Sequence, residues 1–401
     1  MMKKYIILTG AIRNAGGAQL YTANKLSYME SLGWEPYAFF HVAGDVKISY
    51  LNRFIDSHIP EIGRPIQSLK ASVSKKIINN MASAIKAEGD DEIIIESNSL
   101  SLAFWGEALA NSLNAHHVMF PLEESFWNIT KKEAEFFQFK LHRKEIMTST
   151  EYRLRQIFQG YYKAEYNQYL LGLRPYCSNV VDYTPIELPD SIHKSNSFKI
   201  LSIGRLKKAY INPMLQEIKN FANNHNEAKI DLIMVGGDSD PSIEAAIKEL
   251  YKDVDNVTLY LLGYIFPIPY DWIRISDVCI ASSNSVLVSA EEGIPTIAVD
   301  GHDLKAIGVY GYTTNKKVFR GEEPPLQISM LLEEILIKKK YPKVLKHRNP
   351  VGELASFFQP HVTFLDNIDR EKKYYLLSDI YSPIDCFLAR LKSYARKRFE
   401  I

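Results

Sequence analysis

The chain has 401 residues, which is more than one hydrophobic core ordinarily holds and fits two domains of roughly 150–200 residues. Hydrophobic residues make up 46% and charged residues 24% of the sequence, a composition that excludes a disordered chain and indicates a folded globular protein. The formal net charge of +1 gives no electrostatic reason to expect a nucleic-acid partner.

Cysteine usage and the N-terminal sequence indicate the compartment. Cys177, Cys279 and Cys386 lie far apart, so they form neither a metal-binding spacing nor a disulfide framework and favour a reducing environment. The apolar run Tyr5–Leu8 is too short for a signal peptide or a membrane span and is typical of a buried strand. We therefore expect a cytoplasmic protein.

In the first half of the chain, strand-like apolar runs alternate with segments of helical periodicity. Tyr5–Leu8 is followed by the polar loop Gly10–Gly17 and a helix that ends at Gly33. Further strands are predicted at Phe39–Val42, Glu92–Ile95, His117–Phe120 and Glu145–Thr148, and helices at Lys76–Ala87, Leu102–Leu113 and Glu151–Phe158. A stretch rich in Pro, Ser and polar residues then predicts a linker.

The second half repeats this alternation. Strands are predicted at Phe198–Ile203, Ile230–Val235, Val257–Leu262, Val278–Ala281 and Thr296–Val299, and helices at Pro213–Asn223, Ser242–Tyr251 and Tyr270–Ile275. The pattern predicts an α/β protein with two doubly wound parallel sheets. We expect an N-terminal domain over residues 1–186, a linker over 187–196, a C-terminal domain over 197–372 and a helical segment over 373–401.

The segment from Ser276 to Ala298 carries the strongest functional signal. The predicted strand Val278–Ala281 runs into a turn of small polar residues, Ser282-Ser283-Asn284-Ser285, before a second strand begins at Thr296. Such a turn at the carboxyl end of a strand directs backbone N–H groups at a ligand above the sheet. This pattern predicts a site for a phosphate or a polar sugar.

Several segments share their order and spacing with a known family. They are Gly16-Gly17-Ala18-Gln19 with the following SLGWEPYAFF, then EIMTSTEYRLRQIF, ILSIGRLKKAYINPMLQEI, DLIMVGGDSD, DNVTLYLLGYI and SDVCIASS…GIPTIA. Together they resemble GT-B-fold glycosyltransferases, closest to the family 4 type that builds bacterial surface polysaccharides. The resemblance implies two Rossmann-like domains, with the last helix crossing back to the first domain. It also implies transfer, with retention of configuration, of a sugar from a nucleotide-sugar donor to a glycan or lipid-linked glycan acceptor, as in capsule or lipopolysaccharide synthesis.

The resemblance also assigns donor-binding residues. Arg205 pairs with the donor diphosphate, for which a guanidinium fork is well suited. The family's lysine five positions later is replaced by Tyr210, so Lys207 or Lys208 takes that role. The remaining donor-binding residues are Gly16 and Gly17, which permit close backbone approach, Gly236 after a strand, Gly263-Tyr264-Ile265 near the nucleobase, and Ser283, Asn284, Ser285 and Val286 at phosphate and sugar. No cofactor and no metal ion are expected.

One departure from the family concerns its pair of donor-site glutamates, whose positions are occupied here by Ile280 and Val288. Glu291 or Glu292 then binds the ribose hydroxyls, or both are solvated residues at a helix end. The missing pair also favours an alternative function, a catalytically inactive GT-B-like glycan-binding subunit that stabilises a partner transferase. A nucleotide-sugar epimerase or hydrolase of the same fold is a third option.

The first half supplies the candidates for catalysis and acceptor binding. Glu123 or Glu124, beyond a predicted strand, acts as general base if burial raises its pKa, and Arg205 stabilises the leaving diphosphate. Alternatively, Glu124 caps the next helix. The acceptor-binding candidates are Glu96, Asn98 and His117, the last of which is otherwise a core residue. The sequence Asp238-Ser239-Asp240 resembles a metal-binding motif, but its predicted place in an open loop argues against a metal site.

The C-terminal residues combine an apolar stripe with basic residues. The stripe consists of Phe387, Leu388, Leu391 and Tyr394, and the basic residues are Arg390, Lys392, Arg396, Lys397 and Arg398. We expect this segment to pack on the N-terminal domain, with peripheral contact to the inner face of the cytoplasmic membrane as an addition.

Overall fold

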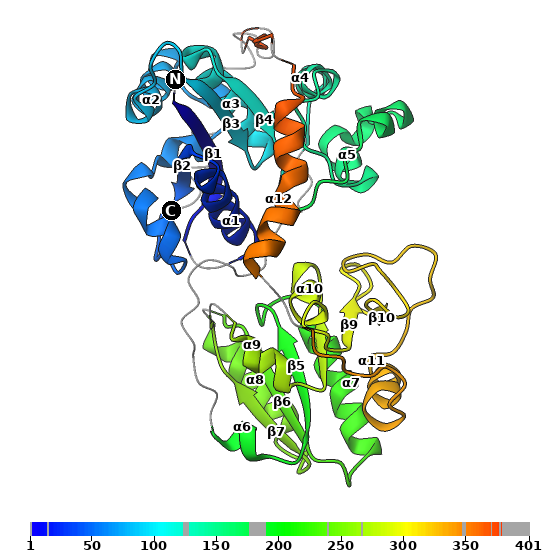
Figure 1. Ribbon diagram of the computed structural model, residues 1–401. Coiled ribbons are helices and arrows are strands. Elements are labelled where there is room, and N and C mark those ends of the chain that lie inside the picture. Colours follow the sequence, from blue (N-terminus) through cyan, green and yellow to red (C-terminus); the bar gives the residue numbers. More distant parts are fainter. Residues whose placement is uncertain are drawn as a thin grey trace. The chain divides into compact units, whose positions relative to one another are not determined.

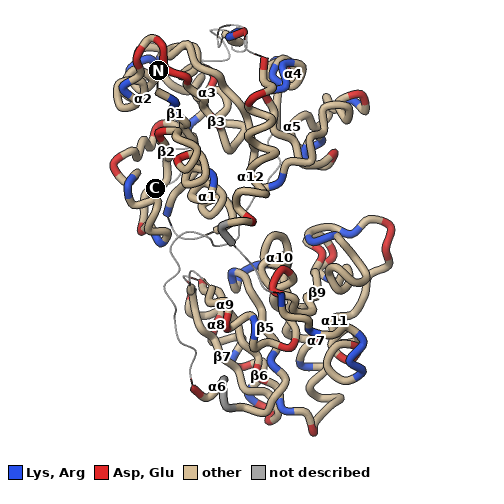
Figure 2. Tube along the Cα trace, viewed as in Figure 1, with Lys and Arg blue, Asp and Glu red and all other residues tan. Residues whose placement is uncertain are grey.

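The chain folds into two units, each with its own sheet and core (Figure 1). The computed structural model describes residues 2–13, 16–122, 128–175, 190–238, 240–265, 268–346, 350–369, 371–376 and 378. Described residues up to 175 and from 350 onward form unit 1, and residues 190–346 form unit 2. Lys and Arg are interspersed with Asp and Glu in both units (Figure 2). Within the described part of the chain, no helix has the length and apolarity needed to span a bilayer.

Unit 1 is built on a parallel sheet of four strands in the order β2-β1-β3-β4. The strands are β1 (Lys3–Ala11), β2 (Trp34–Val42), β3 (Glu92–Ser97) and β4 (His116–Met119). Leu8 of β1 lies opposite Phe39 of β2 and Ser97 of β3. The middle residues of β1 and β3, Tyr5–Leu8 and Ile93–Ile95, are continuous runs of large buried apolar side chains, as expected of a parallel sheet that is covered on both faces.

Helices complete unit 1. They are α1 (Gly17–Ser31), α2 (Ala71–Ile85), α3 (Leu100–Leu113), α4 (Lys131–His142), α5 (Glu151–Phe158) and α12 (Pro350–Asp366), with short 3₁₀ segments η1 (Ser49–Ser57), η2 (Pro60–Gly63), η3 (Ile66–Ser68), η4 (Gln159–Tyr161) and η5 (Ala164–Tyr169). Polar caps set several starts, including a full capping box between Thr130 and Glu133 at α4. Helix α12 packs on α1, where the ring of Phe358 stacks on Tyr28 with centroids 5.6 Å apart.

Unit 2 has a sheet of six strands in the order β10-β9-β8-β5-β6-β7. The strands are β5 (Phe198–Ile203), β6 (Ile230–Val235), β7 (Val257–Leu261), β8 (Val278–Ala281), β9 (Thr296–Val299) and β10 (Ala306–Val309), of which only β10 pairs antiparallel. Its helices are α6 (Asp190–Lys194), α7 (Ile211–Asn224), α8 (Pro241–Tyr251), α9 (Tyr270–Ile275), α10 (Asn284–Ala290) and α11 (Ile328–Leu332), and α11 continues into the π-helical turn η6 (Glu333–Ile337).

The two parallel-sheet units confirm the predicted α/β fold class, but some boundaries differ. The predicted strand Glu145–Thr148 is reduced to a single bridge between Ile146 and Met119. Half of the predicted linker is helix α6, because Ile192 is fully buried in the core of unit 2. The return to unit 1 begins at Pro350 instead of residue 373, so α12 does not belong to the second domain. The C-terminal stripe from residue 387 onward lies outside the described residues.

Candidate functional site

The chain reverses its direction across the sheet of unit 2 next to β5. It runs from β5 to β6 and β7 on one side and then crosses to β8 on the other. In α/β sheets, ligands bind at the carboxyl ends of the strands at such a switch point. Because β5 and β8 are paired neighbours, the loop at Gly204-Arg205 and the turn at Ser282-Ser283 follow adjacent strand ends.

Glycines let the loops after β5, β6 and β7 pack backbone to backbone. Gly236 has φ +146°, and a Cβ atom there would lie 1.9 Å from the carbonyl oxygen of Gly204. The N–H of Gly236 donates to the carbonyl of Gly263 at 2.8 Å, and the N–H of Gly204 donates to Val235 at 3.0 Å. Only glycine fits at 236, because any side chain would collide with the backbone of the β5 loop.

Arg205 lies in the loop after β5, next to the packed glycines. Its side chain is exposed, and no ion pair or hydrogen bond to it is found among the described residues. Lys207, two residues on, lies 3.5 Å from the carboxylate of Asp238, which also accepts the N–H of Asp240 at 3.1 Å. Asp238 is therefore engaged locally, and no group of three or more potential metal ligands occurs in the described ranges.

Tyr210, where the family places a lysine, lies under the β5 loop. It is 3% exposed, and a Cβ atom at Gly204 would lie 2.7 Å from its hydroxyl oxygen. Burial raises the pKa of this hydroxyl, so it stays neutral and carries no charge toward a phosphate. Lys208, whose Nζ is 5.8 Å from the Tyr210 ring centroid, is the remaining candidate for the missing lysine.

The turn after β8 is fixed by a cation that sequence reasoning missed. Ser283 adopts φ +64°, and its N–H donates to the carbonyl of Lys317 at 2.7 Å. The Lys317 ammonium donates in turn to Asn284 Oδ1 at 2.5 Å. No sequence signal identifies Lys317, since it lies 33 residues beyond Asn284 in an irregular segment.

Two of the four residues expected to bind the donor at this turn are used internally. The N–H of Ser283 is taken by Lys317, and the N–H of Val286 donates to Ser283 at 3.1 Å while the Val286 side chain is buried. Asn284 and Ser285 form the first turn of α10, where helical backbone N–H groups have no acceptor within the helix. The backbone N–H groups of Ser283 and Val286 are therefore engaged within the protein, and the role of Asn284 and Ser285 as backbone donors stays a prediction.

The predicted ribose-binding role of Glu292 is not supported by its position. Its side chain is fully buried, and its carboxylate accepts from Arg274 Nε at 2.8 Å. The backbone carbonyl of Glu292 accepts the N–H of Lys346 at 3.2 Å. Glu292 thus links the segment after α10 to Arg274 of α9 and to Lys346. Glu291 beside it is only half buried.

The end of β7 provides an aromatic surface. Gly263 has φ +69°, which favours glycine, and the next residue, Tyr264, has 47% of its surface exposed. Ile265 is partly buried against the core of unit 2. An exposed ring beside a strand end can stack on a planar base.

Unit 1 has its own switch point, between β1 and β3. Helix α1 begins there at Gly17, with Gly16 as its N-cap, and has neither a side-chain cap nor an acidic residue in its first turn. Its N–H groups and the positive end of its dipole are thus uncompensated by side chains. The φ of Gly16 is an ordinary −146°, so its conformation does not require glycine.

Glu96 and Asn98 follow the same edge, but Glu96 is enclosed. Its carboxylate accepts from the Tyr5 hydroxyl at 2.6 Å, the Tyr21 hydroxyl at 3.0 Å and Asn98 Nδ2 at 2.7 Å. The side chain has no exposed surface, and Asn98 is only 4% exposed. The predicted acceptor contact of Glu96 is therefore wrong for this conformation, because internal donors occupy its oxygens.

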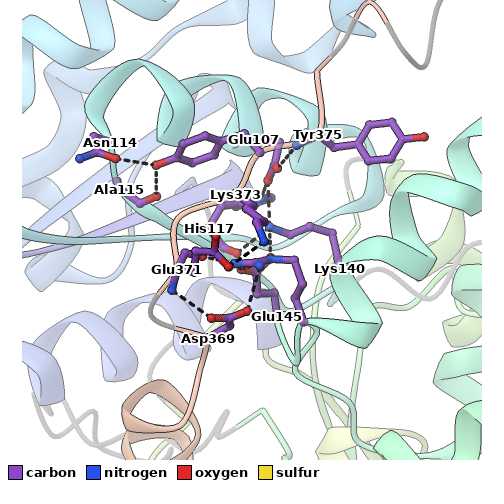
Figure 3. A network of polar contacts seen from close by, with 12 residues as sticks. Glu107, Asn114, Ala115, His117, Lys140, Glu145, Asp369, Glu371, Lys373 and Tyr375 are labelled. Atoms are coloured by element: carbon purple, nitrogen blue, oxygen red, sulfur yellow. Dashed lines mark hydrogen bonds and ion pairs between the residues drawn. The ribbon is translucent and has the colours of Figure 1, made fainter.

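His117 is likewise part of a buried network (Figure 3). Its Nδ1 lies 2.8 Å from Glu107 Oε2 and its Nε2 lies 3.0 Å from Ser97 Oγ. This order matches a serine-histidine-acid triad, but Ser97 is fully buried, so no substrate reaches it. Burial and the nearby Lys140 lower the pKa of His117 to about 4, which makes it a neutral core residue rather than an acceptor ligand.

The proposed general bases Glu123 and Glu124 lie outside the described residues. Their role therefore remains a prediction of the sequence. Of the residues predicted to bind the donor, Gly16 and Gly17 lie at this switch point of unit 1, and both are partly exposed.

No family model matches this chain, and no curated protein matches it. Solved structures do share its fold. A glycosyltransferase from Rickettsia africae ESF-5 aligns with a TM-score of 0.58 at 15% identity, over 98% of this chain and 99% of the other. HepE of Anabaena, in complex with UDP-glucose, aligns with a TM-score of 0.51 at 14% identity, over 92% and 98%. The lipopolysaccharide outer core galactosyltransferase WaaB aligns at 0.50 and 13%, over 98% and 100%.

The same fold also occurs in a protein assigned as a UDP-N-acetylglucosamine 2-epimerase in Listeria monocytogenes, with a TM-score of 0.50 at 14% identity, over 94% and 100%. At these identities the alignments establish the GT-B fold, with two parallel-sheet Rossmann-like domains, and leave the chemistry to the residues.

Proposed function

We propose that this protein is a glycosyltransferase that moves a sugar from a nucleotide-sugar donor to a glycan acceptor in bacterial surface polysaccharide synthesis. The observation that carries the proposal is Arg205, an exposed guanidinium at the switch point of a GT-B-type second sheet. The fold is shared with HepE, which was solved in complex with UDP-glucose, and with a lipopolysaccharide outer core galactosyltransferase, so a UDP-sugar is the first donor to test.

In this proposal three kinds of residue bind different parts of the nucleotide-sugar. Arg205, Lys208 and Lys317 supply positive charge for the donor diphosphate, and their charge stabilises the leaving group without a metal ion. The N–H groups of Asn284 and Ser285 bind phosphate or sugar oxygens. Tyr264 stacks on the nucleobase.

The test is calorimetric titration of the full chain with UDP and UDP-glucose. Arg205→Ala should weaken UDP binding roughly 10- to 150-fold, because a hydrogen bond to a charged group contributes about 1.5–3 kcal/mol. Lys248→Ala, which removes an exposed cation of α8 in the same unit, is the matched control and should leave affinity unchanged. Equal affinity of the Arg205 variant and the parent would refute the donor site.

Turnover then separates the candidate activities. A transferase releases UDP only when an acceptor glycan is present, whereas a hydrolase releases it without one. An epimerase, an activity assigned to a protein of the same fold, interconverts the sugar without an acceptor glycan. Binding of UDP with none of these turnovers would support the alternative of an inactive subunit beside a partner transferase.

A further inference from the structure

A pocket of about 860 Å³ lies in unit 1, away from the strand ends described above. It is enclosed by the end of α4, the segments around residues 144–146 and 168–173, and one face of α12. Its lining residues are Leu141, Lys144, Ile146, Gln168, Tyr169, Leu171, Leu173, Ser356, Gln359, Pro360, Thr363, Phe364 and Asn367. The volume falls in the range of roughly 300–1,000 Å³ that is typical of small-ligand sites.

The floor of this pocket is apolar. Leu141, Ile146, Leu173 and Phe364 line it and are themselves at most 8% exposed. At its rim Leu171 keeps 44% of its surface exposed, although it is a large aliphatic residue. A ligand with a hydrocarbon body would remove this surface from water, which is favourable in proportion to the apolar area buried.

Three polar residues of the α12 wall, Gln359, Thr363 and Asn367, already have side-chain hydrogen bonds inside the protein. The Thr363 hydroxyl donates to the carbonyl of Gln359 at 3.1 Å, and Asn367 Nδ2 donates to the carbonyl of Thr363 at 2.7 Å. The side-chain oxygen of Gln359 accepts from the Tyr28 hydroxyl at 3.4 Å. A ligand therefore need not satisfy these groups, and Pro360 adds an apolar ring between them.

The pocket carries one charge. Lys144 lies two residues after the C-terminal end of α4, in a left-handed conformation with φ +55°. It is exposed, and no carboxylate pairs with it in the described part of the chain. The described lining residues include neither Asp nor Glu. An anionic group placed beside Lys144 would thus meet a cation and no opposing negative charge.

We propose that this pocket binds a single-chain lipid with one anionic head group. The hydrocarbon chain lies on Leu141, Ile146, Leu173 and Phe364, and the head group pairs with Lys144. An apolar floor, an α12 wall with three internally bonded polar side chains and a single cation at the rim match an anionic amphiphile and mismatch a sugar, which needs many free hydrogen-bonding groups. The inference does not depend on the proposed transferase activity.

The test titrates the full chain with octyl, decyl and dodecyl phosphate, each below its critical micelle concentration. We expect affinity to rise up to roughly 15-fold for every two methylene groups added, since each buried methylene contributes about fourfold. Inorganic phosphate alone should show no binding, and dodecyltrimethylammonium should bind more weakly than dodecyl phosphate. Absence of dodecyl phosphate binding, or equal affinity for the three chain lengths, would overturn the proposal.

Paired variants locate the site. Ser356→Trp fills the pocket from an exposed α12 position and should reduce dodecyl phosphate affinity at least tenfold, whereas Ala355→Trp, on the neighbouring exposed residue outside the lining, should not. Lys144→Glu should reduce affinity severalfold for the phosphate and not for the ammonium compound, with Lys75→Glu of α2 as the control. Unchanged affinity in Ser356→Trp, with an unchanged melting temperature, would place the lipid elsewhere and refute the site.

Discussion

Lys140 holds together the buried charges of unit 1, and its removal gives the sharpest stability prediction (Figure 3). The side chain is 1% exposed, and its Nζ lies 2.8 Å from Glu107 Oε2 and 2.6 Å from Glu145 Oε2. Burial by itself would raise the pKa of Glu107, but Lys140 together with His117 holds it at about 2. The carboxylate is therefore ionised in the core at neutral pH, and its charge depends on this ammonium.

Lys140→Met keeps the aliphatic stem of the side chain and removes its charge. Breaking a buried pair by removing one partner costs about 3–5 kcal/mol, because the other charge is left uncompensated. Urea unfolding followed by circular dichroism at pH 7 measures this loss. The exposed Lys144 gives the matched control, since Lys144→Met should change stability by less than about 0.5 kcal/mol.

The same variant has a local readout. The N–H of Tyr375 donates to Glu107 Oε1 at 2.8 Å, and Lys372 Nζ donates to the carbonyl of Asn114 at 2.6 Å, so residues 371–376 are held on α3. Hydrogen exchange of this segment should accelerate when Glu107 loses its cation. Adding Glu107→Gln to Lys140→Met should recover part of the stability, because the uncompensated charge disappears. A loss below about 1 kcal/mol for Lys140→Met would refute the electrostatic reasoning.

Three further predictions concern pH, backbone fit and the donor-site glutamate. Burial, reinforced by a nearby lysine, lowers the pKa of His361 to about 2, so between pH 6.5 and 4 only the unfolded chain takes up a proton at this residue. The free energy of unfolding should therefore decrease by about 1.4 kcal/mol for each unit by which the pH is lowered in this range. His361→Gln should remove this slope in urea titrations at pH 7, 6 and 5. Gly236→Ala should cost about 2–4 kcal/mol and weaken UDP binding, whereas Gly89→Ala, with open space around it, should do neither. Glu292→Gln should lower the melting temperature through its contact with Arg274 yet keep UDP affinity within twofold; a large fall in affinity would restore its role at the ribose.

Strands with continuous buried runs were predictable from the sequence. The predicted bounds of β5, β6, β8 and β9 agree with the structure, because each is a run of apolar residues between clear turn signals. Strand β10 was missed, since it has four residues, contains Gly308 and pairs antiparallel with an irregular register. Helix α12 was assigned to the wrong unit because its place depends on packing against α1, which no local pattern encodes.

The candidate site was predictable only where it follows from strand ends. Arg205 and Gly236 follow the ends of β5 and β6 within two residues, so a prediction of parallel strands places them at one edge of a sheet. Partners distant in sequence were not predictable: Glu96 is enclosed by tyrosines 91 and 75 residues away, and the cation at Asn284 lies 33 residues on. Such contacts decide whether a polar residue is available to a ligand or is already engaged.

The order in which the elements occur along the chain has a consequence for biogenesis. Unit 2 is one contiguous stretch of the sequence, whereas unit 1 consists of two stretches that flank unit 2. The second stretch of unit 1 begins at Pro350 with α12. Emerging from the ribosome, unit 2 is therefore complete while the α1 surface at Tyr28, which Phe358 later covers, is still bare. Nascent chains that stall before α12 would expose the apolar surface of α1 to chaperones and proteases.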